Sequence, residues 1–382
     1  MCSTPAAPEP QDHTALVAEP DGTPEVVTFS ASTQSQVENK VEELAETSQV
    51  LAVEQDQPVT ALSVSPGDDS YYTQQWGFDS SKMNFNAAWN TNNVDGSGVR
   101  VAVIDTGVSA THPDLAANVV QGKDFVETSG QASQNATIDG NGHGTHVAGI
   151  VAAADNAIGV VGGAPHATVV PVRVLDCNGS GAYSAVAAGI LWASDSIANG
   201  GGGAQVINLS LGGLASSSVM QNAINTAIAR GTVVVAAAGN CGQGGSTCNN
   251  QSNAPVYPGA YSEVLTVGAI QQSGAKATYS NNNTYVDVAA PGSGVPSTWP
   301  SVTGSGHCLA GTQYECLNGT SMATPHVAAL AALVKQQCGL SYAVTQVIAK
   351  ITSTVGPAIS GFASSVGLAR PDVATALPVS CP

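Results

Sequence analysis

The sequence VAVIDTG, residues 101–107, is an apolar and largely β-branched run that ends in an aspartate and a glycine. A run without polar alternation predicts a strand that is buried on both faces, as strands of parallel sheets are. In open α/β sheets the functional groups lie beyond the carboxyl ends of the strands. Asp105 is therefore predicted to end a central strand, at the edge of the sheet where a site would form.

Four further short runs share this β-branched composition and alternate with stretches of helical length. They are Val169–Val174, Val206–Leu209, Val233–Ala236 and Leu265–Val267. Strands that alternate with helices predict an α/β fold in which a mostly parallel central sheet is covered by helices on both faces.

A histidine and a serine stand in settings that suit nucleophilic catalysis. NGHGTHVA, residues 141–148, places His143 between glycines, which let a neighbouring backbone approach closely. GTSMATP, residues 319–325, places Ser321 on a turn entered through a glycine, just before a predicted helix from Ala323 to Val334. A nucleophilic serine needs a base and a group that orients the base. Together with Asp105, the chain supplies all three residue types.

The order Asp105, His143, Ser321 and the sequence motifs around these residues resemble those of the subtilisin family of serine endopeptidases. The resemblance continues through the words NLSLGG at 208–213, AAAGN at 236–240 and VAAPG at 288–292, and it covers roughly residues 71–376. It implies a subtilisin-like three-layer fold and hydrolysis of peptide bonds in proteins. Ser321 would be the nucleophile, His143 the general base and acid, and Asp105 the group that orients the imidazole. The side-chain amide of Asn240 would stabilise the oxyanion together with the backbone N–H of Ser321.

No catalytic role is expected for the other histidines or for Asp139. The resemblance implies structural positions for three histidines, and the other three are expected on loops. These are His112, His146 and His326 in the first group, and His13, His166 and His307 in the second. Asp139 is expected to be a surface or loop carboxylate and not a second catalytic acid.

The resemblance also implies two extended segments, residues 179–181 and 211–213, that hold a substrate strand between them by β-augmentation. The implied substrate-binding residues are Gly179, Ser180, Gly181, Ser210, Leu211, Gly212, Gly213, Ala238 and Gly239. The primary pocket would be lined by residues 210–213, residues 237–240 and the stretch around Val256. Because these words contain no acidic residue, we predict broad specificity with a preference for medium or large apolar side chains. A processing protease of narrow specificity is the alternative, and an inactive binding protein of the same fold is the weaker one.

A structural calcium ion is the cofactor that the resemblance implies. DNAIGV at residues 155–160 matches the calcium loop of the family, and HPD at 112–114 supplies a matching carboxylate. Calcium prefers hard oxygen ligands, and the implied ligand residues are Asp69, Asp114, Ala154, Asn156, Ile158 and Val160. A loop without an ion is the alternative. The chain contains no His-Glu-x-x-His word, so zinc-assisted hydrolysis is not expected.

The first 67 residues form a separate, acidic segment. They contain eleven Asp and Glu residues against Lys40 alone, which accounts for −10 of the formal net charge of −17. Residues 25–30 alternate like a strand, residues 34–47 carry apolar side chains at helical spacing, and residues 50–53 form another apolar run.

A strand–helix–strand unit before such a domain resembles the small α+β inhibitory propeptide of the family, which implies a self-processing zymogen. Its cleavage is expected near Leu62, after the apolar run at residues 59–62. A permanent small domain or a partly disordered acidic arm is the alternative. The predicted organisation is a tether at 1–14, a propeptide-like domain at 15–67 and a peptidase domain at 68–382.

Eight cysteines indicate an oxidising compartment and therefore a secreted, extracellular protein. The spacing favours local disulfides between Cys241 and Cys248 and between Cys308 and Cys316, and a third bridge between Cys338 and Cys381. Cys177 is left as a buried small hydrophobe or as the partner of another cysteine. No signal peptide is recognisable, and we expect one to have been removed before residue 1.

Cys2 is followed by a proline-rich stretch, which suggests a second hypothesis, a lipid anchor at Cys2 on a cell-surface lipoprotein. The absence of a long apolar run argues against a membrane span. The acidity of the chain argues against nucleic acid as a partner. The expected partners of this monomer are therefore protein and peptide substrates and its own propeptide.

Overall fold

The computed structural model describes residues 11–18, 20–21, 24–55, 68–126, 135–301, 308–356, 358–362 and 366–369. The chain divides into two compact units, Met1–Leu62 and Ser63–Pro382, and each is described by itself. This division falls before the predicted one between residues 67 and 68. Cys2, the region around Leu62, His307 and Cys381 lie outside the described residues.

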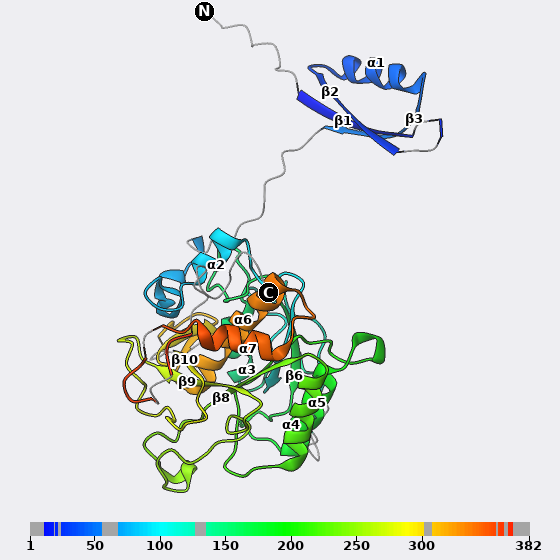
Figure 1. Ribbon diagram of the computed structural model, residues 1–382. Helices are drawn as coiled ribbons and strands as arrows, with labels where there is room; N and C mark the ends of the chain where they lie inside the picture. Colours follow the sequence, from blue (N-terminus) through cyan, green and yellow to red (C-terminus); the bar gives the residue numbers. More distant parts are fainter. Residues whose placement is uncertain are drawn as a thin grey trace, which may run out of the picture. The chain divides into compact units, whose positions relative to one another are not determined.

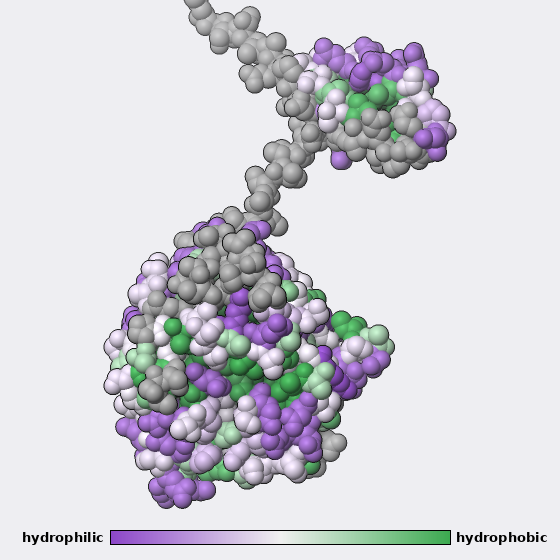
Figure 2. All heavy atoms as spheres, in the orientation of Figure 1, coloured by the Kyte–Doolittle hydropathy of each residue, from purple (hydrophilic) through white to green (hydrophobic). Residues whose placement is uncertain are grey.

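The first unit is an antiparallel sheet of strand order β2-β1-β3 with one helix (Figure 1). Its elements are β1 (Gln11–Ala18), β2 (Pro24–Ala31), α1 (Gln34–Ala45) and β3 (Gln49–Gln55). The predicted strand, helix and strand are all present, and the Thr33 hydroxyl caps α1 by accepting from the N–H of Gln36. Ala15, Val17 and Ala31 form a small buried core, while hydrophilic residues gather over α1 (Figure 2).

The strand β1 differs from the prediction, which placed a tether at residues 1–14. Its first residues, Gln11 to Thr14, are polar or charged, and this composition conceals a strand whose partners on both sides come from later in the chain. His13 was expected on a loop and lies instead within β1. Its ring stacks on Phe29, with 5.6 Å between the centroids.

The second unit contains a seven-stranded sheet of order β10-β9-β8-β7-β4-β6-β5, in which every neighbouring pair is parallel. Its strands are β4 (Arg100–Asp105), β5 (Lys123–Asp124), β6 (Thr168–Arg173), β7 (Val206–Leu209), β8 (Val233–Ala237), β9 (Leu265–Ile270) and β10 (Val288–Pro291). A two-stranded antiparallel ribbon, β11 (Val295–Thr298) and β12 (Tyr314–Leu317), lies outside this sheet. The predicted mostly parallel sheet is confirmed.

Helices cover both faces of the sheet, as predicted (Figure 1). The longer helices of this unit are α2 (Phe85–Asn92), α3 (His143–Ala152), α4 (Tyr183–Ser194), α5 (Ser218–Ala229), α6 (Thr320–Cys338) and α7 (Val344–Ser353); short 3₁₀ turns are η2 (Tyr72–Gln74), η3 (Trp76–Phe78), η4 (Ile197–Asn199) and η5 (Ser246–Cys248). Side chains of β4 alternate between two cores: Val101 and Val103 pack with α3, α6 and α7, whereas Ala102 and Ile104 pack with α4 and α5.

The helix α6 carries Ser321 and packs against five strands of the sheet, β4, β7, β8, β9 and β10. Its residues are buried from Thr320 to Lys335, except that Ser321 is half-buried. The many alanines of α6 let its backbone lie close to the sheet. Pro325 is the sixth residue of the helix and has no N–H for the carbonyl of Ser321, which accepts from the Ser210 hydroxyl instead. Ser321 is therefore held by a rigid, buried element.

Both predicted local disulfides are present. The Cα atoms are 5.6 Å apart in Cys241–Cys248 and 5.7 Å apart in Cys308–Cys316. Cys338 is also disulfide-bonded. Cys177 has no disulfide partner among the described residues and is exposed, so its interpretation as a buried hydrophobe is wrong. None of the described helices is long and apolar enough to cross a membrane.

Candidate active site

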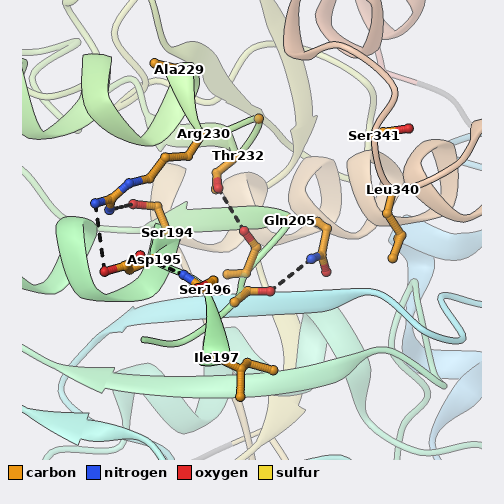
Figure 3. A pocket seen from close by; sticks show the side chains of 13 residues that line it. Ser194, Asp195, Ser196, Ile197, Gln205, Ala229, Arg230, Thr232, Leu340 and Ser341 are labelled. Atoms are coloured by element: carbon orange, nitrogen blue, oxygen red, sulfur yellow. Dashed lines mark hydrogen bonds and ion pairs between the residues drawn. The ribbon is translucent and has the colours of Figure 1, made fainter. Parts of the chain in front are cut away.

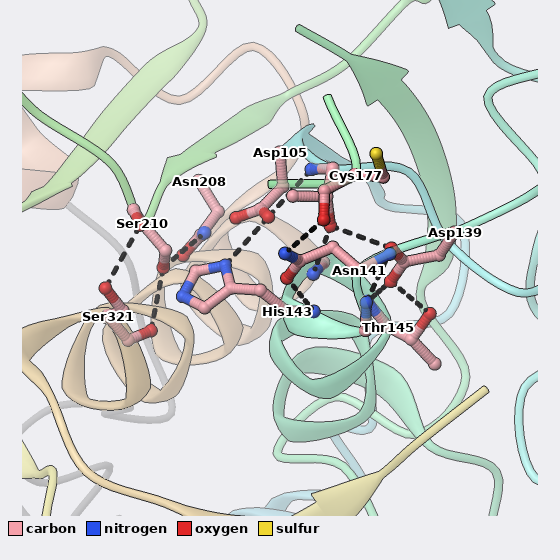
Figure 4. A network of polar contacts seen from close by, with 12 residues as sticks. Asp105, Asp139, Asn141, His143, Thr145, Cys177, Asn208, Ser210 and Ser321 are labelled. Carbon is pink, nitrogen blue, oxygen red and sulfur yellow. Dashed lines mark hydrogen bonds and ion pairs between the residues drawn. The ribbon is translucent and has the colours of Figure 1, made fainter. Parts of the chain in front are cut away.

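Three side chains from separate elements meet at the carboxyl ends of the central strands (Figure 4). Asp105 is the last residue of β4, His143 the first of α3 and Ser321 the second of α6. Asp105 is fully buried, and its Oδ1 lies 2.8 Å from Nδ1 of His143. The structure therefore brings together an aspartate and a histidine that are separated by 38 residues of sequence.

The charge of Asp105 determines the state of this imidazole. Burial by itself lowers the pKa of His143, but the charge and hydrogen bond of Asp105 oppose it, and the pKa is raised above its ordinary value. With Nδ1 protonated toward Asp105, Nε2 keeps its lone pair. That nitrogen faces Ser321 (Figure 4). The pair can thus accept a proton from a group on that side.

The hydroxyl of Ser321 is directed toward a backbone carbonyl. Its Oγ donates to the carbonyl of Ser210 at 3.1 Å, while Ser210 Oγ donates to the carbonyl of Ser321 at 2.8 Å. The amide of Asn208 in turn donates to Ser210 Oγ at 2.9 Å. The hydroxyl therefore does not donate to Nε2 of His143 in this structure, and catalytic hydrogen bonds commonly tighten only when substrate is bound.

The side chain of Asn240 is oriented by Thr320. Its Oδ1 accepts from the N–H of Thr320 at 2.9 Å and from the Thr320 hydroxyl at 3.0 Å. These two donors require the oxygen to face Thr320, so the amide nitrogen is free to point elsewhere. A Cβ placed on Gly319 would lie 3.5 Å from this nitrogen, which locates it over the turn that enters Ser321. Sequence reasoning did not identify Thr320 as a partner of Asn240.

A groove of about 520 Å³ runs beside His143 and contains most of the predicted binding segments. It is lined by Thr106, Asn141, His143, Leu175, Asn178, Gly179, Ser180, Gly181, Tyr183, Val186, Ser210, Leu211 and Gly212. Leu175, Tyr183 and Val186 were missed because isolated apolar residues in a sequence do not differ from core residues. They give the groove an apolar wall in addition to the glycine-rich segments.

A second hollow of about 260 Å³ adjoins Ser321 and corresponds to the predicted primary pocket. Its lining is Leu211, Gly212, Gly213, Leu214, Ala237, Gly239, Asn240, Cys241, Thr247, Cys248, Val256, Thr320 and Ser321. The predicted Ser210 and Ala238 are not part of this lining, although Ser210 lines the neighbouring groove. The disulfide loop from Cys241 to Cys248 supplies one wall, and the lining contains no charged side chain.

Val256 narrows this pocket between two of its walls. A Cβ placed on Gly212 would lie 2.5 Å from one methyl of Val256, and a Cβ placed on Gly239 would collide with the other. The two glycines therefore leave space that the valine side chain fills. Gly239 also has a φ of 101°, a conformation that other residues rarely adopt.

Two buried carboxylates fit the predicted cation site. Asp69 and Asp114 are 4% and 0% exposed, and Oδ2 of Asp69 and Oδ1 of Asp114 have no hydrogen-bond partner in the described part of the chain. Burial raises the pKa of each of these carboxyl groups to about 7. Such oxygen atoms are costly to bury as charges unless a cation binds them.

The surrounding loop adds further oxygen ligands. The carboxylates of Asp68, Asp69 and Asp155 can place one oxygen each within 4.8 Å of the others. The loop curls around Asp114, whose Oδ2 accepts from the N–H of Val160 at 2.9 Å. The N–H of Asn156 donates to Asp69 Oδ1 at 3.4 Å and its side chain hydrogen-bonds Asp114, so the predicted Asp69, Asp114 and Asn156 are linked. Asp68 and Asp155 were missed, although each is adjacent in sequence to a predicted ligand.

Two predictions about other titratable groups can be compared with the structure. His112, His146 and His326 are buried, and each ring contacts a backbone carbonyl. His166 lies in a turn and pairs with Asp95 at 3.0 Å. Asp139, expected to be a surface or loop carboxylate, lies in a loop and is buried, with 8% of its surface exposed. Its burial was not predicted because the donors that surround the carboxylate include one from a distant segment, Thr106.

Another hollow, of about 720 Å³, opens at the amino ends of β7 and β8 (Figure 3). Most of its polar side chains have partners within the fold. Arg230 pairs with Asp195 at 3.9 Å and donates to Ser194, the Thr232 hydroxyl donates to the carbonyl of Ala204, and Gln205 donates to Gly203. These contacts connect the segments that form the walls of the hollow.

The chain is similar in sequence to one family of known proteins. The family described as "Subtilase family" matches residues 96–368. Thermitase of Thermoactinomyces vulgaris is 44% identical over 274 residues, which cover 72% of this chain and 86% of the relative. The alkaline protease of Alkalihalobacillus alcalophilus is 42% identical over 317 residues, covering 80% of this chain and 74% of the relative.

Two solved structures are similar as well. One, described as proteases from Pseudoalteromonas arctica, has a TM-score of 0.68 and 35% identity and covers 81% of this chain and 98% of its own. The other, a cold-adapted subtilisin-like serine proteinase, has a TM-score of 0.61 and 33% identity and covers 77% of this chain and 96% of its own.

Proposed function

Because the chain belongs to the subtilase family and is a serine-type endopeptidase, we propose that it cleaves proteins through Asp105, His143 and Ser321. The observation that supports this assignment most directly is the 2.8 Å contact between the buried Asp105 and His143, with Ser321 on the other side of the ring. These are the roles that a serine nucleophile requires.

In the proposed reaction, Oγ of Ser321 attacks the carbonyl carbon of the scissile peptide while its proton passes to Nε2 of His143. Asp105 stabilises the imidazolium through Nδ1 without taking the proton. The tetrahedral intermediate collapses as Nε2 protonates the leaving amine, which leaves an acyl ester on Ser321. Water then attacks the ester with His143 as base, and the acid product and free Ser321 are released.

The oxyanion of both intermediates would be stabilised by the amide nitrogen of Asn240 and the backbone N–H of Ser321. The two hydrogen bonds from Thr320 support this role because they hold the oxygen of the Asn240 amide on Thr320 and leave the amide nitrogen to face another way. The Ser321 N–H lies in the first turn of α6, where backbone donors have no partner within the helix. Preorganised donors of this kind contribute because they need no reorientation during the reaction.

We propose that substrates bind as an extended strand between residues 179–181 and 211–213, with broad specificity and an apolar preference. The apolar, uncharged lining of the pocket at Ser321 supports this preference. The position of Val256 favours small to medium side chains over the large ones that were also expected. A narrow-specificity processing protease is the second candidate, and a peptide library that is cleaved at one sequence would favour it.

The first unit would act as an inhibitory propeptide that the enzyme removes itself near Leu62. Its compact strand and helix arrangement supports this proposal. Secretion is supported by the two disulfides, which persist in oxidising compartments. A lipid anchor at Cys2 and a monomeric state remain proposals from the sequence, and mass analysis and light scattering of the natively produced protein test them.

A calcium ion would be held by Asp69, Asp114 and Asn156 with carbonyls of Ala154, Ile158 and Val160, and with Asp68 or Asp155 nearby. The unpartnered buried oxygens of Asp69 and Asp114 support this assignment. When bound, the ion would supply charge neutralisation that joins the segment around Asp69 to the loop at residues 154–160. It takes no part in the proposed reaction.

The decisive experiment compares the intact mass and N-terminal sequence of the protein with those of Ser321→Ala, after incubation of each with calcium. Loss of a fragment of roughly 60 residues from the parent alone would support the catalytic serine and self-processing together, since only the hydroxyl differs. If neither protein is cut and the parent does not hydrolyse casein, the inactive binding protein would replace the proposed function.

A further inference from the structure

Asp139 lies four residues before His143 and accepts five hydrogen bonds from the segments that carry Asp105 and His143. Its Oδ1 accepts from the N–H groups of Asn141 at 3.0 Å and Gly142 at 2.8 Å. Its Oδ2 accepts from the N–H of Thr145 at 2.9 Å and from the Thr145 hydroxyl at 2.7 Å. All these partners are uncharged donors, so none of these hydrogen bonds pairs the carboxylate with a cation.

The first group of these bonds fixes the start of α3. The helix begins at His143 itself, and its N-cap residue, Gly142, has a φ of 108° and no side chain that could accept a hydrogen bond. The first N–H groups of a helix need acceptors from outside the helix. Asp139 accepts from the N–H of Thr145 and from that of the N-cap residue Gly142, whereas Asn141 and Thr106, which Asp139 also binds, accept from His143 and Gly144. A negative charge at this end is also favoured by the helix dipole. The backbone position of His143 therefore depends on Asp139.

The fifth bond connects Asp139 to the strand that ends in Asp105. The Thr106 hydroxyl donates to Asp139 Oδ1 at 2.9 Å and accepts from the N–H of Gly144 at 2.9 Å. The N–H of Thr106 donates to Oδ1 of Asp105 at 2.8 Å, the same oxygen that faces His143. Oδ2 of Asp105 has no hydrogen-bond partner among the described residues. The orientation of Asp105 thus depends on Thr106, whose hydroxyl is bound to Asp139.

The same turn also reaches the substrate groove. The side chain of Asn141 accepts from the N–H of His143 at 3.2 Å and donates to the carbonyl of Cys177 at 3.0 Å. Cys177 precedes the groove-lining residues 178–181. Because Asp139 accepts from the N–H of Asn141, it is connected to one wall of the groove as well as to Asp105 and His143.

The other charged groups near His143 leave Asp105 and Asp139 as its principal anions. His146 on the same helix and His326 on α6 are fully buried, and burial lowers the pKa of both, so they are neutral at neutral pH. Arg173, beside Asp105 on β6, is paired with Asp124 at 2.8 Å. No described cation therefore directly opposes the field of Asp139 at the imidazole.

We propose that Asp139 is a positioning residue for the triad: it locks the turn that carries His143 onto the end of β4, and its buried charge stabilises the imidazolium that forms when Ser321 loses its proton. The inference rests on the proposed function. The charge of Asp139 acts in the same direction as that of Asp105, since both raise the pKa of His143.

The test compares the wild-type enzyme, Asp139→Asn and Asp195→Asn, each processed and calcium-loaded, on a peptide p-nitroanilide across the pH range. Asp195→Asn removes one charge at the hollow beside the amino ends of β7 and β8, whereas the catalytic residues lie at the carboxyl ends of the strands, and it is the matched control (Figure 3). For Asp139→Asn we expect kcat to fall by roughly 10- to 100-fold through misplacement of His143, with KM changed by less than about threefold. The acidic limb of kcat/KM should move to lower pH by about half a unit, less than a charge in direct contact causes.

A second pair of variants separates position from charge. Thr145→Val removes a hydroxyl that Asp139 accepts from but keeps the carboxylate, whereas Thr145→Ser keeps the hydroxyl. We expect Thr145→Val to lower kcat by roughly three- to tenfold without moving the acidic limb, and Thr145→Ser to recover most of this loss. Should Asp139→Asn not fold, kcat of Thr145→Val equal to that of wild type would overturn the proposal.

A purely structural role for Asp139 would lower the melting temperature but leave the acidic limb where it is, and that outcome would also overturn the proposal. The pKa of His143, followed by NMR in Ser321→Ala with and without Asp139→Asn, gives a readout that does not need activity. If wild type does not cleave peptides but this pKa falls on loss of Asp139, the proposed function fails while the electrostatic role of Asp139 stands.

Discussion

Truncation of Val256 tests how the pocket beside Ser321 selects its substrate. The side chain is 7% exposed, and its methyl groups lie against Gly212 and Gly239 on two walls of the pocket. Val256→Ala removes two methyl groups and opens that space to a substrate side chain. Each buried methylene contributes about 0.8 kcal/mol, so a large side chain that fills the space would gain about 1.6 kcal/mol relative to alanine.

This gain corresponds to a roughly 15-fold increase in the ratio of kcat/KM for a substrate with phenylalanine before the scissile bond over one with alanine. The assay uses two peptide p-nitroanilides that differ only at this residue. Val264→Ala, the same truncation in the core beneath α4 and α5, is the control. Both variants should lose stability, but only Val256→Ala should change the ratio. A change of less than about twofold for Val256→Ala would refute the assignment of Val256 as the residue that limits pocket size.

Three further predictions concern the triad, the oxyanion and the cation site. Activity should be lost as the pH falls through the pKa of His143, because only the neutral imidazole accepts the proton of Ser321. Since this pKa is raised, the acidic limb of a kcat/KM profile should lie above the ordinary pKa of histidine. An acidic limb below that value would contradict the pairing with Asp105. Asn240→Ala should lower kcat by about 10²- to 10³-fold with little change in KM, the effect that loss of the corresponding amide has in subtilisin. Thr320→Val should lower kcat less. Equal activity of Asn240→Ala and wild type would exclude the amide from the oxyanion site. Removal of calcium with a chelator should lower the melting temperature of the wild type but not that of Asp114→Asn, because the variant lacks a carboxylate that needs the ion. Calorimetry of both proteins measures this, and an identical shift of the two melting temperatures would argue against a calcium site at Asp114.

Much of the architecture was accessible from local sequence. Strands such as β4 are short, apolar and β-branched because both faces are covered, so composition alone marks them. The helix at Ser321 was predicted from alanine-rich sequence and begins three residues earlier than expected, since helix ends depend on capping contacts. Where a strand begins with polar residues, as β1 does, composition fails, because its hydrogen-bond partners lie elsewhere in the chain.

The sequence by itself determined the motifs that identify the family, and with them the residue types at positions 105, 143, 240 and 321. It did not determine the surroundings of these residues. Asp139, between isoleucine and glycine, was predicted to be a surface or loop carboxylate, yet the fold brings Thr106 to it and buries it in its loop. Val256 and Thr320 likewise act through contacts made across sequence gaps. Burial and hydrogen-bond partners arise from packing of distant segments, and so only the tertiary structure decided which side chains tune the site.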